Sequence, residues 1–189
     1  MKTLNQYIQE KLIINKDYHD NKIVVKSFDE LRKIIIDRYD KLGPGTEQDP
    51  IDFNDIDVSN LDSFRNDKDT GLFEDTDFKY IDISDWDVSN IKSMNSMFAY
   101  CEELRSVGDI SNWDVSSVKD MWFMFFSCKY FNQDISSWNV SNVTDMAYMF
   151  EGCKKFNQDI SGWDVSNVRY KTDIFNHCAI KEEYKPKFK

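Results

Sequence analysis

The four cysteines are the residues with the clearest chemical potential, because thiolates bind metals and pair as disulfides. They lie 27, 25 and 25 residues apart, at Cys101, Cys128, Cys153 and Cys178. No Cys-x-x-Cys pair occurs, and only His19 and His177 could supply imidazole ligands. An unpaired cysteine usually packs as a small apolar residue. We therefore expect buried, reduced thiols in a reducing compartment, with no metal and no cofactor.

No set of residues indicates catalysis. His19 precedes the repeated part of the sequence and His177 lies in its last copy, so no Ser–His–Asp arrangement is suggested. Neither a phosphate-binding loop nor a G-x-G-x-x-G motif occurs. The sequence therefore predicts that the protein is not an enzyme.

Asp67, Asp69 and Gly71 resemble part of a calcium-binding loop. An EF-hand loop requires glycine at its sixth position and glutamate at its twelfth. Counted from Asp67, these positions hold Leu72 and Phe78. The pattern fails, and we expect no calcium site there.

The net charge of −10 is concentrated in one part of the 189-residue chain. Between Gly43 and Asn90 there are 14 acidic and three basic residues, a local charge of −11. Direct binding of nucleic acid normally needs a basic surface, so we expect none. No apolar run reaches the length of a membrane span, and the N-terminal sequence lacks a signal-peptide core. These features predict a cytoplasmic protein without membrane contact, with the cell surface as the alternative location.

A sequence repeat supplies the elements that must position these residues. Each copy begins with a tryptophan, at Trp86, Trp113, Trp138 and Trp163. A phenylalanine follows each tryptophan after 12 residues and a cysteine after 15. A degenerate copy begins at Ile56, in the sequence I-D-V-S-N-L. Repetition at such a period indicates stacked units that complete one another's apolar core.

Within one repeat the spacing of the apolar residues changes. Trp138 and Val140 alternate with polar residues, as in a strand with one face inward. The next apolar residues have helical spacing, at Val143, Met146, Met149, Phe150 and Cys153. We therefore expect an α/β fold, a right-handed solenoid of about five strand–helix repeats over residues 51–180. Residues 181–189 would form a basic tail.

Residues 1–50 are expected to form a helix–strand–helix module that caps the first repeat. The apolar residues of segment 4–14 have helical spacing, and residues 22–26 resemble a short strand. Ser27 and Glu30 form a capping box for a second helix, which a Gly-Pro pair ends. Terminal repeats of a solenoid need a polar-faced cap. The alternative is a separate docking element.

The candidate binding site lies on the outward side of the predicted strands. If tryptophan and valine point inward, two polar columns point outward, namely Asp87, Asp114, Asn139 and Asp164, and Ser89, Ser116, Ser141 and Ser166. Such side chains also bond the backbone at bends, so a structural role is the alternative. The acidic segment completes the candidate site with Asp67, Asp69, Glu74, Asp75 and Asp77.

The repeat W-N-V-S-N-V-T-D-M-A-Y-M-F-E-G-C-K-K-F-N-Q-D-I-S closely resembles that of BspA-type leucine-rich-repeat proteins. The resemblance is specific over residues 80–178 and weaker over 51–79. It implies a leucine-rich-repeat-like solenoid that binds proteins and carries no catalytic residues. Many members of that family are secreted or surface-attached adhesins, whereas this chain has few repeats and an added N-terminal module.

Together these observations favour a non-enzymatic protein–protein interaction module. It would bind a basic partner protein through the strand face and the acidic segment 43–90. In one form of this hypothesis, a phage-encoded inhibitor occupies the basic groove of a host defence protein. The alternative is a bacterial surface adhesin or a structural coat component. The sequence does not determine the oligomeric state.

Overall fold

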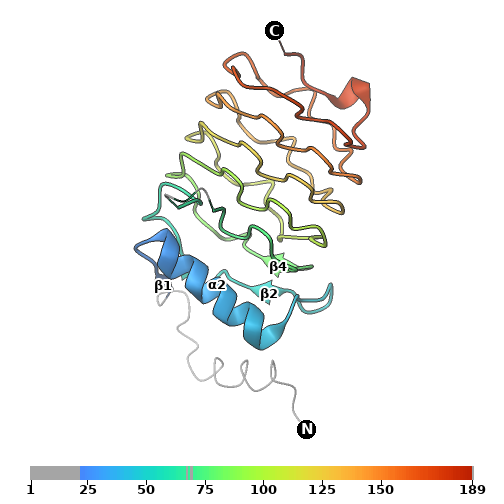
Figure 1. Cartoon of the computed structure of the whole chain (residues 1–189). Coiled ribbons are helices and arrows are strands. Elements are labelled where there is room, and N and C mark those ends of the chain that lie inside the picture. Colours follow the sequence, from blue (N-terminus) through green and yellow to red (C-terminus); the bar gives the residue numbers. More distant parts are fainter. Residues whose placement is uncertain (1–21, 67, 69, 189) are drawn as a thin grey trace.

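A computed structural model describes residues 22–188 with the exception of residues 67 and 69 (Figure 1). Its regular elements are β1 (Ile23–Val24), α2 (Phe28–Leu42), β2 (Ile51–Asp52), β3 (Ile56–Asp57), β4 (Ile81–Asp82) and the 3-10 helix η1 (Glu182–Tyr184). The strands form two parallel pairs, β1 with β3 and β2 with β4. The helix predicted over residues 4–14 and His19 lie outside the described residues.

Helix α2 begins and ends as its sequence predicts. The Ser27 hydroxyl accepts a hydrogen bond from the Glu30 N–H at 3.2 Å, and the Glu30 carboxylate accepts one from the Lys26 N–H at 2.9 Å. At the other end, Gly43 adopts a positive φ of 75°, and its N–H donates to the Tyr39 carbonyl. The capping box is confirmed. The inner face of the helix buries Phe28, Leu31 and Ile35.

From β2 onward the chain forms successive layers that stack along one axis, from α2 toward the C-terminus (Figure 1). They comprise residues 51–79, 80–105, 106–131, 132–156 and 157–180, and are called the first to fifth layers below. Single parallel bridges join neighbouring layers, Ser63 with Ser93, then Ser93 with Asp120, Asp120 with Asp145, and Asp145 with Tyr170. Equivalent residues of each copy therefore lie directly above one another.

The predicted fold class, an α/β leucine-rich-repeat-like right-handed solenoid of strand–helix repeats with a small α/β N-terminal capping module, is wrong. The described residues contain one α-helix, α2, which precedes the repeats, and strands of two residues in two small parallel sheets. Residues 143–153, which were expected to be helical, form turns joined by an isolated bridge.

The hydrogen bonds of the fourth layer explain this difference. In a helix each N–H bonds a carbonyl four residues earlier. Here the N–H of Met146 donates to the Tyr170 carbonyl at 2.9 Å and that of Tyr148 to the Thr172 carbonyl at 2.8 Å, both in the fifth layer. Tyr148 also has a left-handed φ of 60°, which a right-handed helix excludes. Consecutive turns nevertheless bury the apolar residues chosen from the sequence, Val143, Met146, Met149, Phe150 and Cys153.

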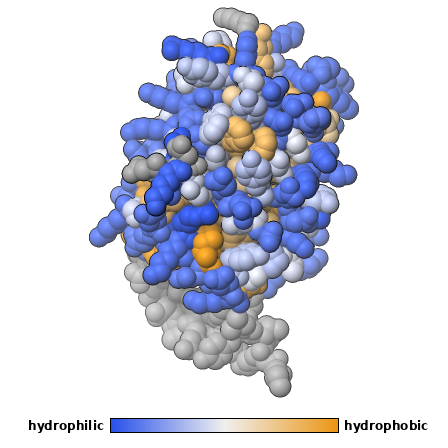
Figure 2. All heavy atoms as spheres, viewed as in Figure 1, coloured by the Kyte–Doolittle hydropathy of each residue, from blue (hydrophilic) through white to orange (hydrophobic). Residues whose placement is uncertain are grey.

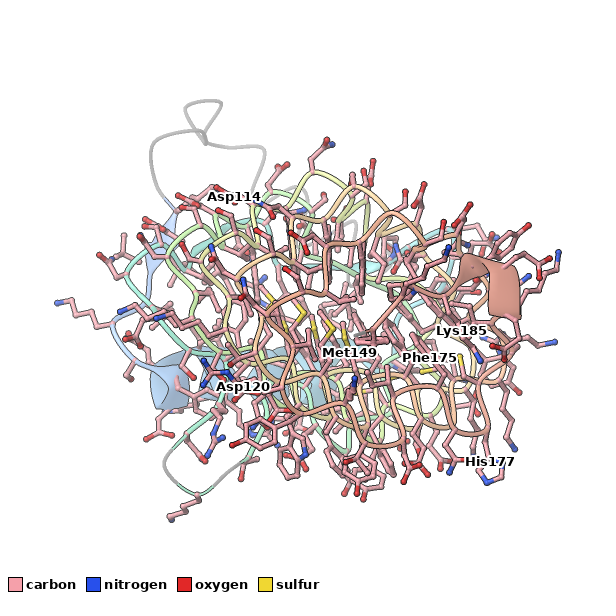
Figure 3. The ribbon with its side chains drawn as sticks, turned by 90° about the horizontal axis from the view of Figure 1, so that it is seen from above. Asp114, Asp120, Met149, Phe175, His177 and Lys185 are labelled. Carbon is pink, nitrogen blue, oxygen red and sulfur yellow. The ribbon has the colours of Figure 1, made fainter. Side chains whose placement is uncertain are left out.

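The core consists of ladders of identical residues, as the repeat predicts. Phe98, Phe125 and Phe150 stack nearly parallel, with ring centroids 5.4 and 5.7 Å apart. All four repeat tryptophans are buried. The indole N–H of Trp138 donates to the Ile110 carbonyl of the layer below at 2.9 Å, and Trp86 and Trp163 make equivalent bonds. In Figure 3, which looks down the stack, Met149 and the sulfur atoms lie in the interior.

Candidate interaction surfaces

The predicted polar columns lie on the surface but also hold the backbone. Asp87, Asp114, Asn139 and Asp164 are exposed. The Oδ1 atom of each accepts a hydrogen bond, at 3.0–3.2 Å, from the N–H two residues later, in Ser89, Ser116, Ser141 and Ser166. These Asx turns are the structural role that the sequence left open as an alternative. The columns are therefore both a backbone support and an acidic surface.

A second acidic column, which the sequence analysis missed, lies five residues before the first. It consists of Asp82, Asp109, Asp134 and Asp159, which make the same turns with Ser84, Ser111, Ser136 and Ser161. The Ser111 and Ser161 hydroxyls and N–H groups hold the pKa of Asp109 and Asp159 below the usual range, and Ser116 does so for Asp114. The repeated tripeptide D-I-S was the available signal. These carboxylates stay charged at neutral pH.

The acidic segment is divided between the two sides of the stack. Asp67 and Asp69 lie outside the described residues. Glu74 is half-buried, and its carboxylate accepts a hydrogen bond from the Gly71 N–H at 2.7 Å. Asp75 and Asp77 are exposed.

The ring stacking places Asp75 away from the acidic columns. Phe73 stacks on Phe98 with ring centroids 5.3 Å apart, which puts Asp75 in the first layer below Tyr100 in the second. His177 occupies the position of Tyr100 in the fifth layer. Figure 3 shows His177 and Asp114 on opposite sides of the ring of chain. The structure therefore does not bring the predicted site residues together on one surface.

On the side of Asp75, five aromatic residues form a continuous surface cluster, called the aromatic patch below. They are Tyr100 in the second layer, Trp122, Phe123 and Phe126 in the third, and Tyr148 in the fourth. Ring centroids are 4.2–5.0 Å apart from Tyr100 to Phe126, from Phe126 to Phe123, and from Phe123 to both Trp122 and Tyr148. Tyr100 is 43% exposed, and the other four are half-buried. Figure 2 shows apolar side chains exposed in the middle of one face, with hydrophilic side chains around them.

Three residues of the aromatic patch have left-handed backbone conformations. Tyr100, Phe123 and Tyr148 have φ values of 61°, 58° and 60°. Bulky residues rarely adopt this conformation, and glycine adopts it readily. Gly152 occupies the position of Tyr100 in the fourth layer, with a φ of 75°. The same repeat positions are left-handed in other layers, where Ser96, Ser127 and His177 occupy them. The conformation is therefore a property of the repeat, and the aromatic rings are what distinguishes the patch.

Two carboxylates border the aromatic patch. Asp120 and Asp145 accept hydrogen bonds at 2.9 Å from the N–H groups of Trp122 and Ala147, each directly before a left-handed aromatic residue. Asp120 also lies 3.9 Å from the Arg65 guanidinium. Asp145 is half-buried and has no ion-pair partner among the described residues. Burial, together with repulsion from Asp120, raises the pKa of Asp145.

The aromatic patch was not predicted from the sequence, because the apolar spacing of this segment indicated a helix. In a helix Met146, Met149 and Phe150 share the buried face, so Tyr148 would be an isolated exposed residue. The available signal was the aromatic content of M-W-F-M-F-F, where Trp122 and Phe123 occupy positions off that face.

The cysteines are free, as expected, and three of them are buried. The Cys128 and Cys153 thiols donate to the Phe98 and Phe125 carbonyls of the layer below at 3.0 Å. Burial raises the pKa of Cys101 to about 12. These thiols therefore stay protonated at neutral pH and act as packing groups, and each donates to one carbonyl of the layer below.

Within residues 22–188, the described positions include no group of three or more His, Cys, Asp or Glu side chains that could hold a metal ion. Over the same part of the chain, none of the helices has the length and apolarity needed to cross a membrane.

The repeats place the chain among known sequences. The family model described as "Mycoplasma protein of unknown function, DUF285" matches residues 68–186. This family is associated with BspA-like repeat proteins, and no leucine-rich-repeat family model matches. No curated protein and no solved structure matches the chain. Because the matched residues make up more than half of its length, the chain belongs to the DUF285 family.

Proposed function

We propose that the chain is a non-enzymatic protein-binding module whose aromatic patch contacts a basic segment of a partner protein. The observation that carries this proposal is a cluster of five partly exposed aromatic rings, in which Tyr100 is 43% exposed, at repeat positions where other layers carry small or polar residues. Tyr, Trp and Phe are enriched in protein interfaces and supply much of their binding energy. An exposed aromatic cluster costs solubility, so a contact that covers it would explain its presence.

The charges around the aromatic patch favour a basic partner. Asp120 and Asp145 border it on one side, and Asp75 lies in the layer below Tyr100. A lysine or arginine of the partner could pair with Asp145 and lie over an aromatic ring. Such a cation would offset the burial and the repulsion from Asp120 that together raise the pKa of Asp145. Charge and ring chemistry therefore favour the same class of partner.

In this proposal the two acidic columns contribute to binding in a different way from the aromatic patch. Their carboxylates are already engaged by serine N–H groups, so they have less capacity for specific contacts. Their summed field would instead speed the approach of a basic protein and would weaken as salt is added. In this proposal the columns affect the association rate, and the aromatic patch sets the lifetime of the complex.

The BspA-type character of the repeat supports a binding role as well. Of the biological settings considered, we favour a cytoplasmic inhibitor of a host protein, encoded by a phage. The partner would then present a basic groove to the aromatic patch. A surface adhesin of a bacterium remains the alternative, and it would use the same patch on an extracellular target.

Affinity capture with matched variants tests the proposal. The patch variant carries Tyr100→Asn, Phe123→Asn and Tyr148→Asn, because asparagine tolerates a left-handed φ and should preserve the fold. The control variant carries Asp87→Asn, Asp114→Asn and Asp164→Asn. Asn139 occupies the same position and makes the same turn, so this change removes charge alone. Lysate of the cells that encode the chain is the source of partners.

The proposal predicts a soluble protein that wild type and the control variant retain and the patch variant loses. Circular dichroism must show that both variants are folded. Loss of the partner with the control variant alone would place the interface on the acidic columns and contradict the proposal. Capture of envelope components by all three proteins would favour the adhesin role.

A further inference from the structure

On the side of the aromatic patch, most hydrogen bonds between layers run in one direction. At the border of the patch a few run the other way, for example from the Arg169 N–H down to the Thr144 carbonyl. Each interface from the second layer to the fifth contains four of them, and in each the lower layer supplies the N–H and the upper layer the carbonyl. The bonds from Tyr148, Phe150 and Gly152 to the carbonyls of Thr172, Ile174 and Asn176 are examples, at 2.8–3.0 Å. The peptide groups that make these four bonds in each interface therefore point the same way along the stack.

Aligned peptide groups add their dipoles, as they do in a helix. Ordinary sheets lack this property, because their peptide dipoles alternate. On the patch side, the end of the stack at the first layer presents carbonyl oxygens and partial negative charge. The end at the fifth layer presents N–H groups and partial positive charge.

The acceptor end is closed by an arginine of α2. The Nη1 atom of Arg32 donates to the carbonyls of Gly71 and Leu72, both at 2.6 Å, and Nη2 reaches the Glu74 carbonyl at 3.4 Å. A guanidinium supplies several donors in a fixed plane and a positive charge. It therefore matches both the carbonyl row and its negative potential.

The donor end has no equivalent cap. The N–H groups of Asp173, Phe175 and His177 occupy the positions of Tyr148, Phe150 and Gly152, one layer higher. None of the three has an acceptor within the described residues. Asp173 and His177 are exposed. Figure 3 views this end from above, with Phe175 and His177 both in the uppermost layer.

The side chains along this end are more basic than the rest of the protein. Arg169 and Lys171 are exposed on either side of Tyr170, and Lys185 lies over the Phe175 ring at 5.5 Å. Asp173 supplies one opposing carboxylate, and Glu182, which forms an ion pair with Lys185, supplies a second. A net positive edge with unbonded N–H groups contrasts with the overall charge of −10.

We infer that the N–H groups of Asp173, Phe175 and His177 form a second docking edge, which binds an extended acidic segment of a partner protein. In every lower layer, the acceptors for these positions are carbonyls at alternate residues of one stretch of chain. That stretch consists of consecutive turns. An extended peptide also presents the carbonyls of alternate residues on one side, and strand addition uses them. Carboxylates on the peptide match the exposed Arg169. A second copy stacked end to end does not fit, because Arg32 closes its acceptor end.

An amide-resolved titration of the full chain tests this inference independently of the aromatic patch. The probe is a capped peptide of alternating glutamate and threonine, about eight residues long, enough to span the edge. We expect downfield shifts and slower hydrogen exchange for the amides of Asp173, Phe175 and His177. The amides of Tyr148, Phe150 and Gly152, already bonded, should not change. A lysine–threonine peptide of equal length should have no effect.

A charge reversal with a matched control sharpens the test. Arg169→Glu should weaken binding of the acidic peptide about tenfold, because it replaces attraction by repulsion at the edge. Lys119→Glu changes the same repeat position two layers lower and should leave the affinity unchanged. Absence of shifts at the three amides would overturn the inference. Equal shifts with inorganic phosphate but none with the peptide would also overturn it, because the edge would then bind small anions only.

Discussion

At the scale of single residues, the repeat tryptophans differ in one hydrogen bond. The Trp138 indole donates to the Ile110 carbonyl, whereas the buried Trp113 Nε1 has no partner in the described structure. Trp113 follows the longest tryptophan spacing, 27 residues instead of 25. The two extra residues coincide with the place where the regular indole-to-carbonyl bond is missing. Tryptophans at equivalent core positions therefore contribute unequally to the free energy of unfolding.

Replacing these tryptophans by phenylalanine should reveal the difference. Trp138→Phe loses a buried hydrogen bond and should lower the free energy of unfolding by about 1 kcal/mol more than Trp113→Phe. Urea unfolding followed by circular dichroism measures both. Trp138→Ala should cost about 3–5 kcal/mol because it opens a core cavity. Asp164→Ser, on the exposed column, should stay within about 0.5 kcal/mol of wild type. Equal losses for the two phenylalanine variants would contradict the bonding assigned to Trp138.

Two aspartates should respond to pH with opposite sign. The pKa of Asp145 is raised by burial and by Asp120, so its ionisation disfavours folding at neutral pH. Asp145→Asn keeps an acceptor for the Ala147 N–H and should raise the melting temperature at pH 7. This advantage should shrink as the pH falls through the raised folded pKa toward the value of about 3.9 in the unfolded chain.

Asp114 is the control for this experiment. Its pKa is lowered by the Ser116 hydroxyl and N–H, so its charge favours folding above the unfolded pKa. Asp114→Asn should lower the melting temperature slightly at pH 7. The difference should disappear as the pH falls through the lowered folded pKa. Melting curves from pH 3 to pH 7 compare the two variants, and a stabilising effect of both would refute the assignment.

At the scale of elements, α2 stabilises the stack through Arg32 as well as through its apolar face. Arg32→Ala removes a charged donor from three carbonyls of the first layer and should cost about 1.5–3 kcal/mol. Lys33→Ala, the exposed neighbour, should cost no more than about 0.5 kcal/mol. Chemical unfolding measures both. Similar values for the two would mean that the carbonyl row is satisfied equally well by water.

Some elements follow from the sequence, and others depend on hydrogen bonds that the sequence does not specify. The capping box at Ser27 and the register of the tryptophans follow from local chemistry and repetition, and both are confirmed. The helix expected over residues 143–153 is wrong, because apolar spacing of three and four residues fits consecutive turns as well as a helix. Only the partners of the N–H groups separate the two.

The candidate binding surfaces likewise follow from the sequence only in part. The outward position of Asp114 could be predicted, because it follows from alternation with buried neighbours. The aromatic patch could not, because it requires Phe123 and Tyr148 to adopt left-handed conformations and meet across layers. The docking edge formed by the N–H groups of Asp173, Phe175 and His177, called the donor edge below, could not be predicted either, because it depends on the direction of the bonds between layers.

At the scale of the whole molecule, the stack separates three surfaces with different chemistry. The acidic columns lie on one side and the aromatic patch on the other. The donor edge lies at the end away from α2. A partner with a basic segment and a partner with an acidic segment could therefore bind without competing. The central claim is that the aromatic patch is the main interface.

Hydrogen exchange of the captured complex, read by mass spectrometry, tests that claim most directly. The free protein and the complex are compared peptide by peptide. The account predicts slower exchange on binding in residues 95–100, 120–127 and 145–152, which carry the aromatic patch and its bordering carboxylates. Slower exchange confined to residues 109–116 and 134–141, which carry the acidic columns, with no change in the patch segments, would contradict it.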